Sequence, residues 1–334
     1  MLANYILEPD LQISVKGLST EIAQSISNAI AGIVHAFAGS EQPLDFRRMH
    51  RIIVASNLAA ELAELSNDTA SRAPITHTNE EYAVAVAKVL MLPREGTIEI
   101  VPVVSAQLAQ DLVLNESSSS ENDRFRTAVH LIHHELCHVH DDNKKIDAFP
   151  GVFLKHSYTG KDRLIRPLAE TCWAEYIANR LSSATAPECF IANIVASFAD
   201  AITRTKDLFD NEILAYRQHA DIDRLLGCFE RHCGYLIKIA SYTCGYLDGL
   251  NLNLHEISAD TENVLRGSYI EQTWHVLRKS LVEMNSLYPA RWDSLTVFDL
   301  LADVVEAFYG KMGIVLSDLP NGKVYVAVPV RTAN

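Results

Sequence analysis

The chain contains the stretch Arg126-Thr-Ala-Val-His-Leu-Ile-His-His-Glu-Leu-Cys-His138. Its apolar residues recur with helical spacing, at Val129, Ile132 and Leu136. This periodicity predicts an amphipathic helix. The polar run Glu121-Asn-Asp123, just upstream, supplies an N-terminal cap. We therefore expect one helix to carry all the histidines of this stretch.

Two of these histidines have the spacing of metal ligands. His134 and His138 are four residues apart, so they project from the same helical face, one turn from each other. That arrangement suits two ligands of a tetrahedral zinc ion. Glu135 follows the first histidine, where a carboxylate can take a proton from a zinc-activated water. His130 shares this face, and we expect it to pack or to orient a ligand instead of binding the metal.

A hydrolytic zinc site usually has three protein ligands and one open position. Residues 167–182 are predicted to form a second helix, with Pro167 in its first turn. Two carboxylates compete on this helix, Glu170 and Glu175, and they point roughly 140° apart, so only one can face the metal. Asn179 lies one turn after Glu175 and can orient a zinc-binding histidine by a hydrogen bond. We therefore favour Glu175 as the third ligand.

These motifs resemble a known clan. His134-Glu-Leu-Cys-His138, then Asp142, then Glu175-Tyr-Ile-Ala-Asn179, resemble the gluzincins, the thermolysin-like zinc metallopeptidases, and their compact bacterial, minigluzincin-like members of unknown substrate. The resemblance covers about residues 45–183 and is specific at the metal site. It implies one zinc ion per chain.

The resemblance also implies a role for each residue of the site. The implied zinc ligands are His134, His138 and Glu175. Glu135 would be the general base, and Asp142 and Asn179 would orient the ligands from behind. The clan's transition-state donor cannot be assigned by motif, and the candidates stay open: His156, Tyr158, His232 and Tyr235.

The pattern along the chain predicts an α+β fold. We expect a small mixed sheet with the active-site helix and the second ligand helix in a zincin-like arrangement, followed by a largely helical region. The sequence predicts three divisions. Residues 1–44 form a helical segment, and residues 45–186 form the metallopeptidase core. Residues 187–334 form the largely helical region, which ends in a possible β-hairpin at Asn321-Gly322.

Three stretches are predicted to be strands: 51–56, 82–90 and 97–104. Pro102 lacks an amide proton and indicates that the third of them lies at the edge of the sheet. The resembling clan binds substrate along its edge strand. We therefore expect an extended peptide to lie along residues 97–103. The segments 115–122 and 143–162 are predicted to be irregular and to flank the metal helix.

The composition of the chain indicates which classes of partner and which cellular compartment to expect. The 334 residues are 48% hydrophobic and 21% charged, as in ordinary globular proteins. A net charge of −13 argues against nucleic acid and anionic membranes as partners. The six cysteines form no CxxC pair, and residues 1–10 have no signal-type pattern, so we expect reduced thiols in a bacterial-type cytoplasm.

The sequence therefore predicts zinc-dependent hydrolysis of a peptide or protein substrate, with Glu135 as general base. Two alternatives remain open: a non-catalytic zinc protein that binds a partner, and a protease that cuts a single regulatory target. Retention of Glu135 argues against the first, because a structural zinc does not need that carboxylate.

Overall fold

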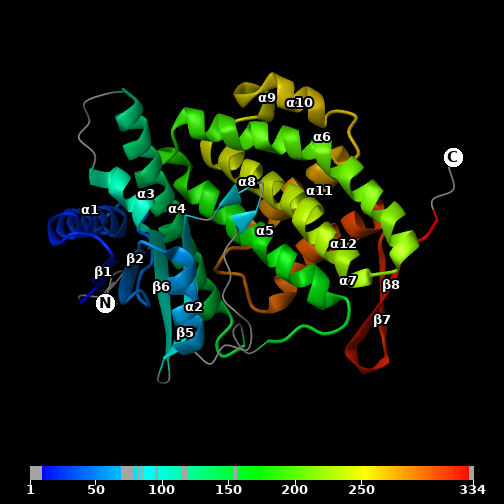
Figure 1. The fold of residues 1–334 in the computed structure, drawn as a ribbon, viewed down its shortest axis with the longest axis horizontal. Helices are drawn as coiled ribbons and strands as arrows, with labels where there is room; N and C mark the ends of the chain where they lie inside the picture. Colours follow the sequence, from blue (N-terminus) through cyan, green and yellow to red (C-terminus); the bar gives the residue numbers. More distant parts are fainter. Residues whose placement is uncertain are drawn as a thin grey trace. The chain divides into compact units, whose positions relative to one another are not determined.

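A computed structural model describes residues 10–68, 79–80, 83–84, 86–94, 97–113, 119–152 and 156–330. The fold is α+β, mostly helical, with a small mixed sheet (Figure 1). The chain divides into two compact units: Met1–Lys144 with Ala184–Pro187, and Lys145–Ser183 with Glu188–Asn334. The three-part division predicted from the sequence stays a prediction.

The first unit is built around a four-stranded sheet with the order β1-β2-β6-β5. β1, β2 and β6 are parallel, and β5 is antiparallel to β6. The helices and strands of this unit are β1 Gln12–Lys16, α1 Thr20–Ala38, β2 Arg51–Ala55, α2 Leu58–Asp68, β3 Asn79–Glu80, β4 Ala83–Val84, β5 Ala87–Arg94, β6 Thr97–Ser105, α3 Ala106–Gln110 and most of α4, Ser119–Ala148.

Both faces of the central strands are buried. On one face, α2 packs its leucines against alternate residues of three strands, in a cluster formed by Ile53, Leu58, Leu62, Leu65, Leu90, Leu92, Val101 and Val103. The intervening residues Ile100 and Val104 point to the opposite face and are also buried. This double burial explains the near-continuous apolar run of β6.

The prediction that residues 97–104 form an edge strand is wrong. β6 lies between β2 and β5. Pro102 is tolerated there for two reasons. The ladder with β2 begins only at Val103. The Ile100 amide, which points to the same side of the strand as position 102, donates to the Arg48 carbonyl instead of to β5. A peptide therefore cannot add to residues 97–103, and the docking model along that strand fails. The edge on this side is β5.

The second predicted strand is also displaced. The sequence predicts a strand over residues 82–90, but β5 covers Ala87–Arg94 and continues through Pro93. Pairing with β6 decides these bounds, from Ala87 opposite Val104 to Arg94 opposite Thr97. Residues 81–82 and 85 lie outside the described part of the chain.

The helix that carries His134 and His138 is longer than the sequence predicts. α4 runs from Ser119 to Ala148, so it takes in the end of the predicted 115–122 loop and the start of the predicted irregular segment 143–162. Residues 114–118 lie outside the described part of the chain. The helix continues because the residues after His138 include buried Ile146 and no helix breaker before the Pro150-Gly151 turn.

The second unit is largely helical, as the sequence predicts. Its helices are α5 Asp162–Ser182, α6 Glu188–His219, α7 Ile222–Cys228, α8 Tyr235–Leu250, α9 Leu254–Ile257, α10 Ala259–Leu265, α11 Glu271–Leu287 and α12 Asp299–Met312. A π-helical turn, Phe229–Gly234, joins α7 to α8. Pro167 lies inside α5 and not at its first turn, because the helix begins five residues earlier, at Asp162.

α5 and α8 lie side by side at close range (Figure 1). Two glycines of α8, spaced one helical turn apart, make this approach possible. A Cβ at Gly245 would lie 2.5 Å from the Tyr176 carbonyl oxygen, and one at Gly249 would lie 2.5 Å from the Arg180 carbonyl oxygen. The backbone of α5 thus rests directly on α8.

A buried carboxylate ties the same helices together. Asp248 of α8 accepts hydrogen bonds from the Tyr176 hydroxyl of α5, at 2.9 Å, and from Arg278 of α11, at 2.7 and 3.1 Å. Burial and the adjacent Asp248 charge raise the pKa of Tyr176, which keeps the phenol a donor. The position of α5 is therefore fixed by both packing and charge.

The hairpin predicted at Asn321-Gly322 is confirmed. β7 Val315–Leu319 and β8 Lys323–Ala327 pair antiparallel, and both turn residues have positive φ, 69° and 70°. The two strands form a sheet of their own instead of returning to the larger one. The Gly322 carbonyl accepts a hydrogen bond from the Gly160 amide, in the segment that leads into α5.

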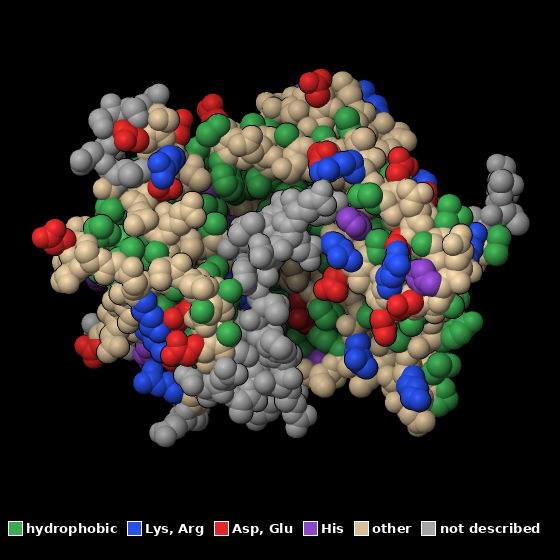
Figure 2. Space-filling model, viewed as in Figure 1, with side chains coloured by type: hydrophobic (Ala, Val, Ile, Leu, Met, Phe, Trp, Pro, Cys, Tyr) green, Lys and Arg blue, Asp and Glu red, His purple; other side chains and the backbone are tan. Residues whose placement is uncertain are grey.

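Within the described ranges, no helix combines the length and the apolar character needed to cross a bilayer. Figure 2 shows acidic and basic side chains interspersed over the visible face, despite the net negative charge.

Gly245→Ala should lower the free energy of unfolding by about 1–3 kcal/mol, the usual cost of overpacking. The added methyl group would meet the Tyr176 carbonyl oxygen. Gly310→Ala in α12 is the matched control, because a Cβ there meets nothing within 4 Å. It should be neutral or stabilising by up to about 1 kcal/mol. Urea unfolding of both variants tests this; equal stability of the Gly245→Ala variant and the wild type would contradict the packing.

Candidate metal centre

His134 and His138 face each other across one turn of α4. Their Nε2 atoms are 3.0 Å apart, and the rings meet edge to face with centroids 4.6 Å apart. The His134 ring is buried, and the His138 ring is half-buried. The four-residue spacing of the two histidines on one helix therefore brings their imidazole rings together.

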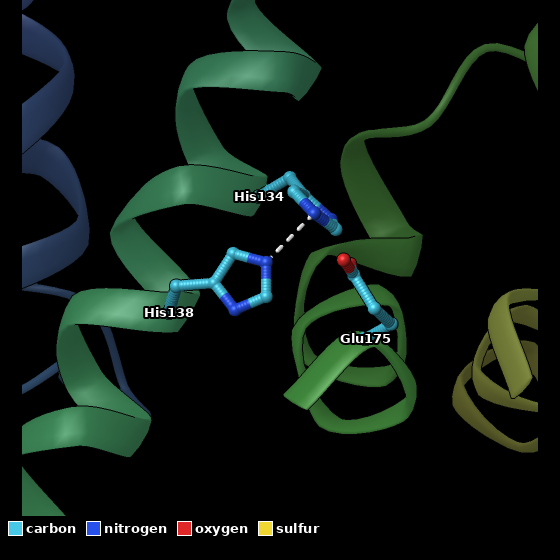
Figure 3. A group of neighbouring side chains, drawn as sticks. All are labelled: His134, His138 and Glu175. Carbon is cyan, nitrogen blue, oxygen red and sulfur yellow. Dashed lines mark hydrogen bonds between the residues drawn. The ribbon is translucent and has the colours of Figure 1, made fainter. Parts of the chain in front are cut away.

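Glu175 of α5 is the third member of the group. One ligand atom each from His134, His138 and Glu175 lie within 4.8 Å of one another. In Figure 3 the two imidazoles project from α4 toward the same side, and the Glu175 carboxylate points toward them from α5. The structure thus brings together all three residues that the sequence proposes as ligands.

The chemistry of this donor set fits zinc. Two imidazole nitrogens and one carboxylate oxygen are a common catalytic set, which leaves a fourth position open. Ligands at about 2.0–2.1 Å from a tetrahedral zinc lie about 3.3 Å from each other. The observed 3.0 Å between the two Nε2 atoms is close to that value.

Glu170, the competing carboxylate, is occupied elsewhere. It accepts a hydrogen bond from the Tyr158 hydroxyl, whose own segment leads into α5. The two glutamates point in different directions because five residues of an α-helix do not return to the same face. Among the described residues, the possible metal-holding group contains Glu175 and not Glu170.

Glu135 lies half-buried on α4, beside His134. Lys88 of the edge strand β5 interacts electrostatically with the Glu135 carboxylate. Burial lowers the pKa of Lys88, and the Glu135 carboxylate opposes that shift. β5 therefore places a cationic group within electrostatic range of the proposed general base. No motif in the sequence singles out Lys88, because its position depends on the pairing of β5 with β6.

The two residues expected to orient the ligands differ in what they contact. Asp142 is buried on α4, one turn after His138. Asn179 is 1% exposed, and its side-chain amide donates to the backbone carbonyl of Glu175 at 2.8 Å. Asn179 therefore braces the turn of α5 that carries Glu175. The predicted bond from Asn179 to a histidine stays a prediction.

The other histidines of α4 anchor the helix. His130 and His133 both place Nδ1 within hydrogen-bond distance of the Thr185 hydroxyl, at 3.1 and 2.9 Å. His133 also stacks on Phe37 of α1, with centroids 3.6 Å apart. Burial, with the nearby His134, lowers the pKa of His133 to about 3, so the ring is neutral. The expected role of His130, to pack or to orient a ligand, stays a prediction.

A charged network fixes the end of α4 nearest the sheet. The buried Asp45 carboxylate pairs with Arg47 and Lys144, each at 2.8 Å. The backbone amide of Asp45 donates to Nδ1 of His140 at 2.8 Å, and the backbone carbonyl of Asp45 accepts from the Asn143 side chain at 3.0 Å. The sequence gives no local signal for this network, since almost one hundred residues separate its two halves.

The four candidates for a transition-state donor all lie in the second unit. The His156 and Tyr158 rings meet edge to face, with centroids 4.7 Å apart. Tyr158 donates to Glu170, and burial together with that bond raises its pKa. His232 lies in the π-helical turn and Tyr235 begins α8, both half-buried. The transition-state donor stays unassigned among these four residues.

Comparison of the chain with protein-family models, with curated proteins and with solved structures finds no match.

The Asp45 network predicts a specific loss of stability in acid. Burial acts to raise the pKa of Asp45, but Arg47 and Lys144 outweigh it and lower the pKa to about 2, from an ordinary value of 3.8. A lowered folded-state pKa means that this contribution is present above the unfolded-state value and is lost as the pH falls toward 2. We expect a contribution on the order of 2 kcal/mol at neutral pH.

Urea unfolding of the wild type and of Asp45→Asn, between pH 6 and about pH 2, measures this contribution. The stability difference between the two proteins should be constant above about pH 5 and should shrink below it. A difference that does not change with pH would contradict the assigned ion pairs.

Proposed function

We propose that this protein is a zinc-dependent peptidase. The observation that carries the proposal is the convergence of the His134, His138 and Glu175 ligand atoms within 4.8 Å, with Glu135 next to the first ligand. A zinc ion held by these residues would supply a Lewis acid that polarises a carbonyl and lowers the pKa of water. A peptide or protein substrate is part of the proposal, as is a cytoplasmic setting for the reduced cysteines.

Glu135 has the central role among the protein's own groups. Its carboxylate accepts a proton from the attacking water and returns it to the leaving amine. The Lys88 ammonium lies within electrostatic range of this carboxylate. Asn179 and the close packing of α5 on α8 hold the turn of α5 that carries Glu175. The edge strand β5, and not β6, offers backbone groups to an extended substrate.

Metal analysis tests the ligands. Wild-type protein, purified and dialysed against a weak chelator, should retain about one zinc per chain, as three protein ligands predict. Glu175→Ala should lose most of it, because one of three donors is gone. Glu170→Ala is the matched control on the same helix and should retain zinc as the wild type does. Loss of zinc from the control, with retention in Glu175→Ala, would contradict the assignment of the third ligand.

Glu135→Gln separates binding from chemistry. The amide has the same shape but cannot accept a proton, so the variant should bind zinc normally and lose at least about 10²-fold in hydrolysis. A peptide-library cleavage assay, run beside metal analysis, measures both. Undiminished cleavage by this variant would rule out Glu135 as the base.

The same assay distinguishes the alternatives. A wild-type protein that binds zinc but cleaves no peptide would indicate a structural zinc and a partner-binding function. Cleavage of one cellular protein, without cleavage of the library, would indicate a single-target protease.

A further inference from the structure

The hydroxyl group of Thr185 joins two histidines of α4. His130 and His133 each place Nδ1 within hydrogen-bond distance of its Oγ1 atom, at 3.1 and 2.9 Å. A hydroxyl group carries one hydrogen and can donate it to one ring only, so the other ring must donate its own Nδ1–H to the oxygen. The two bonds therefore run in opposite directions, and both depend on the hydroxyl group.

Thr185 lies at the end of the helical stretch that carries Glu175. A 3₁₀ turn, Ser183–Thr185, continues α5 directly. Ser183 has helical backbone angles, φ −52° and ψ −38°, and its hydroxyl group donates to a carbonyl of the last turn of α5 at 3.0 Å. Residues Ala184–Pro187 belong to the first unit, although the chain on both sides of them belongs to the second. The chain therefore returns to α4 at Thr185, ten residues after Glu175.

The histidine side of these bonds is held independently of Thr185. The His133 ring stacks on Phe37 of α1, with centroids 3.6 Å apart, and the His130 side chain is fully buried. Both rings also belong to the interior of a helix of 30 residues. Loss of the Thr185 hydroxyl group should therefore free the segment that follows α5 more than it frees the two rings.

We propose that Thr185 is a positioning residue of the candidate metal centre, whose two hydrogen bonds fix where α5 presents Glu175. The inference rests on the proposed zinc site. His130 precedes His134 by one turn of α4, and the Glu175 ligand atom lies within 4.8 Å of that of His134. A rigid helix carries a displacement at its end to the residues of its interior. Without these bonds the end of α5 is less restrained, and zinc binding must immobilise Glu175 again, which weakens affinity.

The zinc affinity of the full chain, measured by competition with a chromophoric chelator, tests this role. Thr185→Val keeps the shape of the side chain without its hydroxyl group. It should weaken zinc binding about tenfold or more, the usual scale for groups that orient metal ligands. Thr185→Ser keeps the hydroxyl group and should bind zinc as the wild type does. Thr203→Val is the matched control, because it removes an exposed hydroxyl group of α6 that donates to the Ala199 carbonyl, and it should have no effect.

A double-mutant cycle with Glu175→Ala separates positioning of this ligand from a general loss of stability. If Thr185 acts through Glu175, adding Thr185→Val to Glu175→Ala should cause little further loss of zinc affinity. An equal loss in both backgrounds would overturn the proposal, because the hydroxyl group would then act on the histidines or on the fold as a whole. If Thr185→Val fails to fold, the smaller Thr185→Ala makes the same comparison.

The wild type distinguishes this proposal from the one on which it rests. Wild-type protein that binds no zinc would overturn the proposed function and this inference with it. Zinc binding by the wild type, with the same affinity in Thr185→Val, would overturn this inference alone.

Discussion

Two imidazole rings that face each other on α4, with 3.0 Å between their Nε2 atoms, set the main constraint on this molecule. Two neutral rings at this distance can share only one proton, and two protonated rings would repel each other. In the proposed metal site, a cation would accept lone pairs from both rings, and the carboxylate of Glu175 would add negative charge.

Contacts of other residues hold α4 in place. His130 and His133 lie within hydrogen-bond distance of the Thr185 hydroxyl, and the His133 ring stacks on Phe37. Near the sheet, Asp45 binds the last turns of the helix through Lys144, His140 and Asn143. Burial, together with Lys144, lowers the pKa of His140 to about 4, so the ring stays neutral and accepts the Asp45 amide. A rigid helix of this kind preserves ligand geometry better than a loop does.

Local sequence predicted the features that local forces decide. Helical periodicity marked α4, and Asn321-Gly322 marked the hairpin, because both depend on neighbours within a few residues. The position of β6 inside the sheet, the true bounds of β5 and the ion pairs of Glu99 depend on strands far apart in the sequence. The group of three ligands could be proposed from spacing alone, whereas Lys88 beside Glu135 could not, since pairing of β5 with β6 places it there.

A crystal of the protein grown with zinc, with anomalous data recorded on both sides of the zinc absorption edge, tests the central claim most directly. The account predicts one strong anomalous peak, bonded to Nε2 of His134, to Nε2 of His138 and to a carboxylate oxygen of Glu175, at about 2.0–2.2 Å from each. A peak bonded to other residues, or no peak within reach of the two imidazoles, would contradict it.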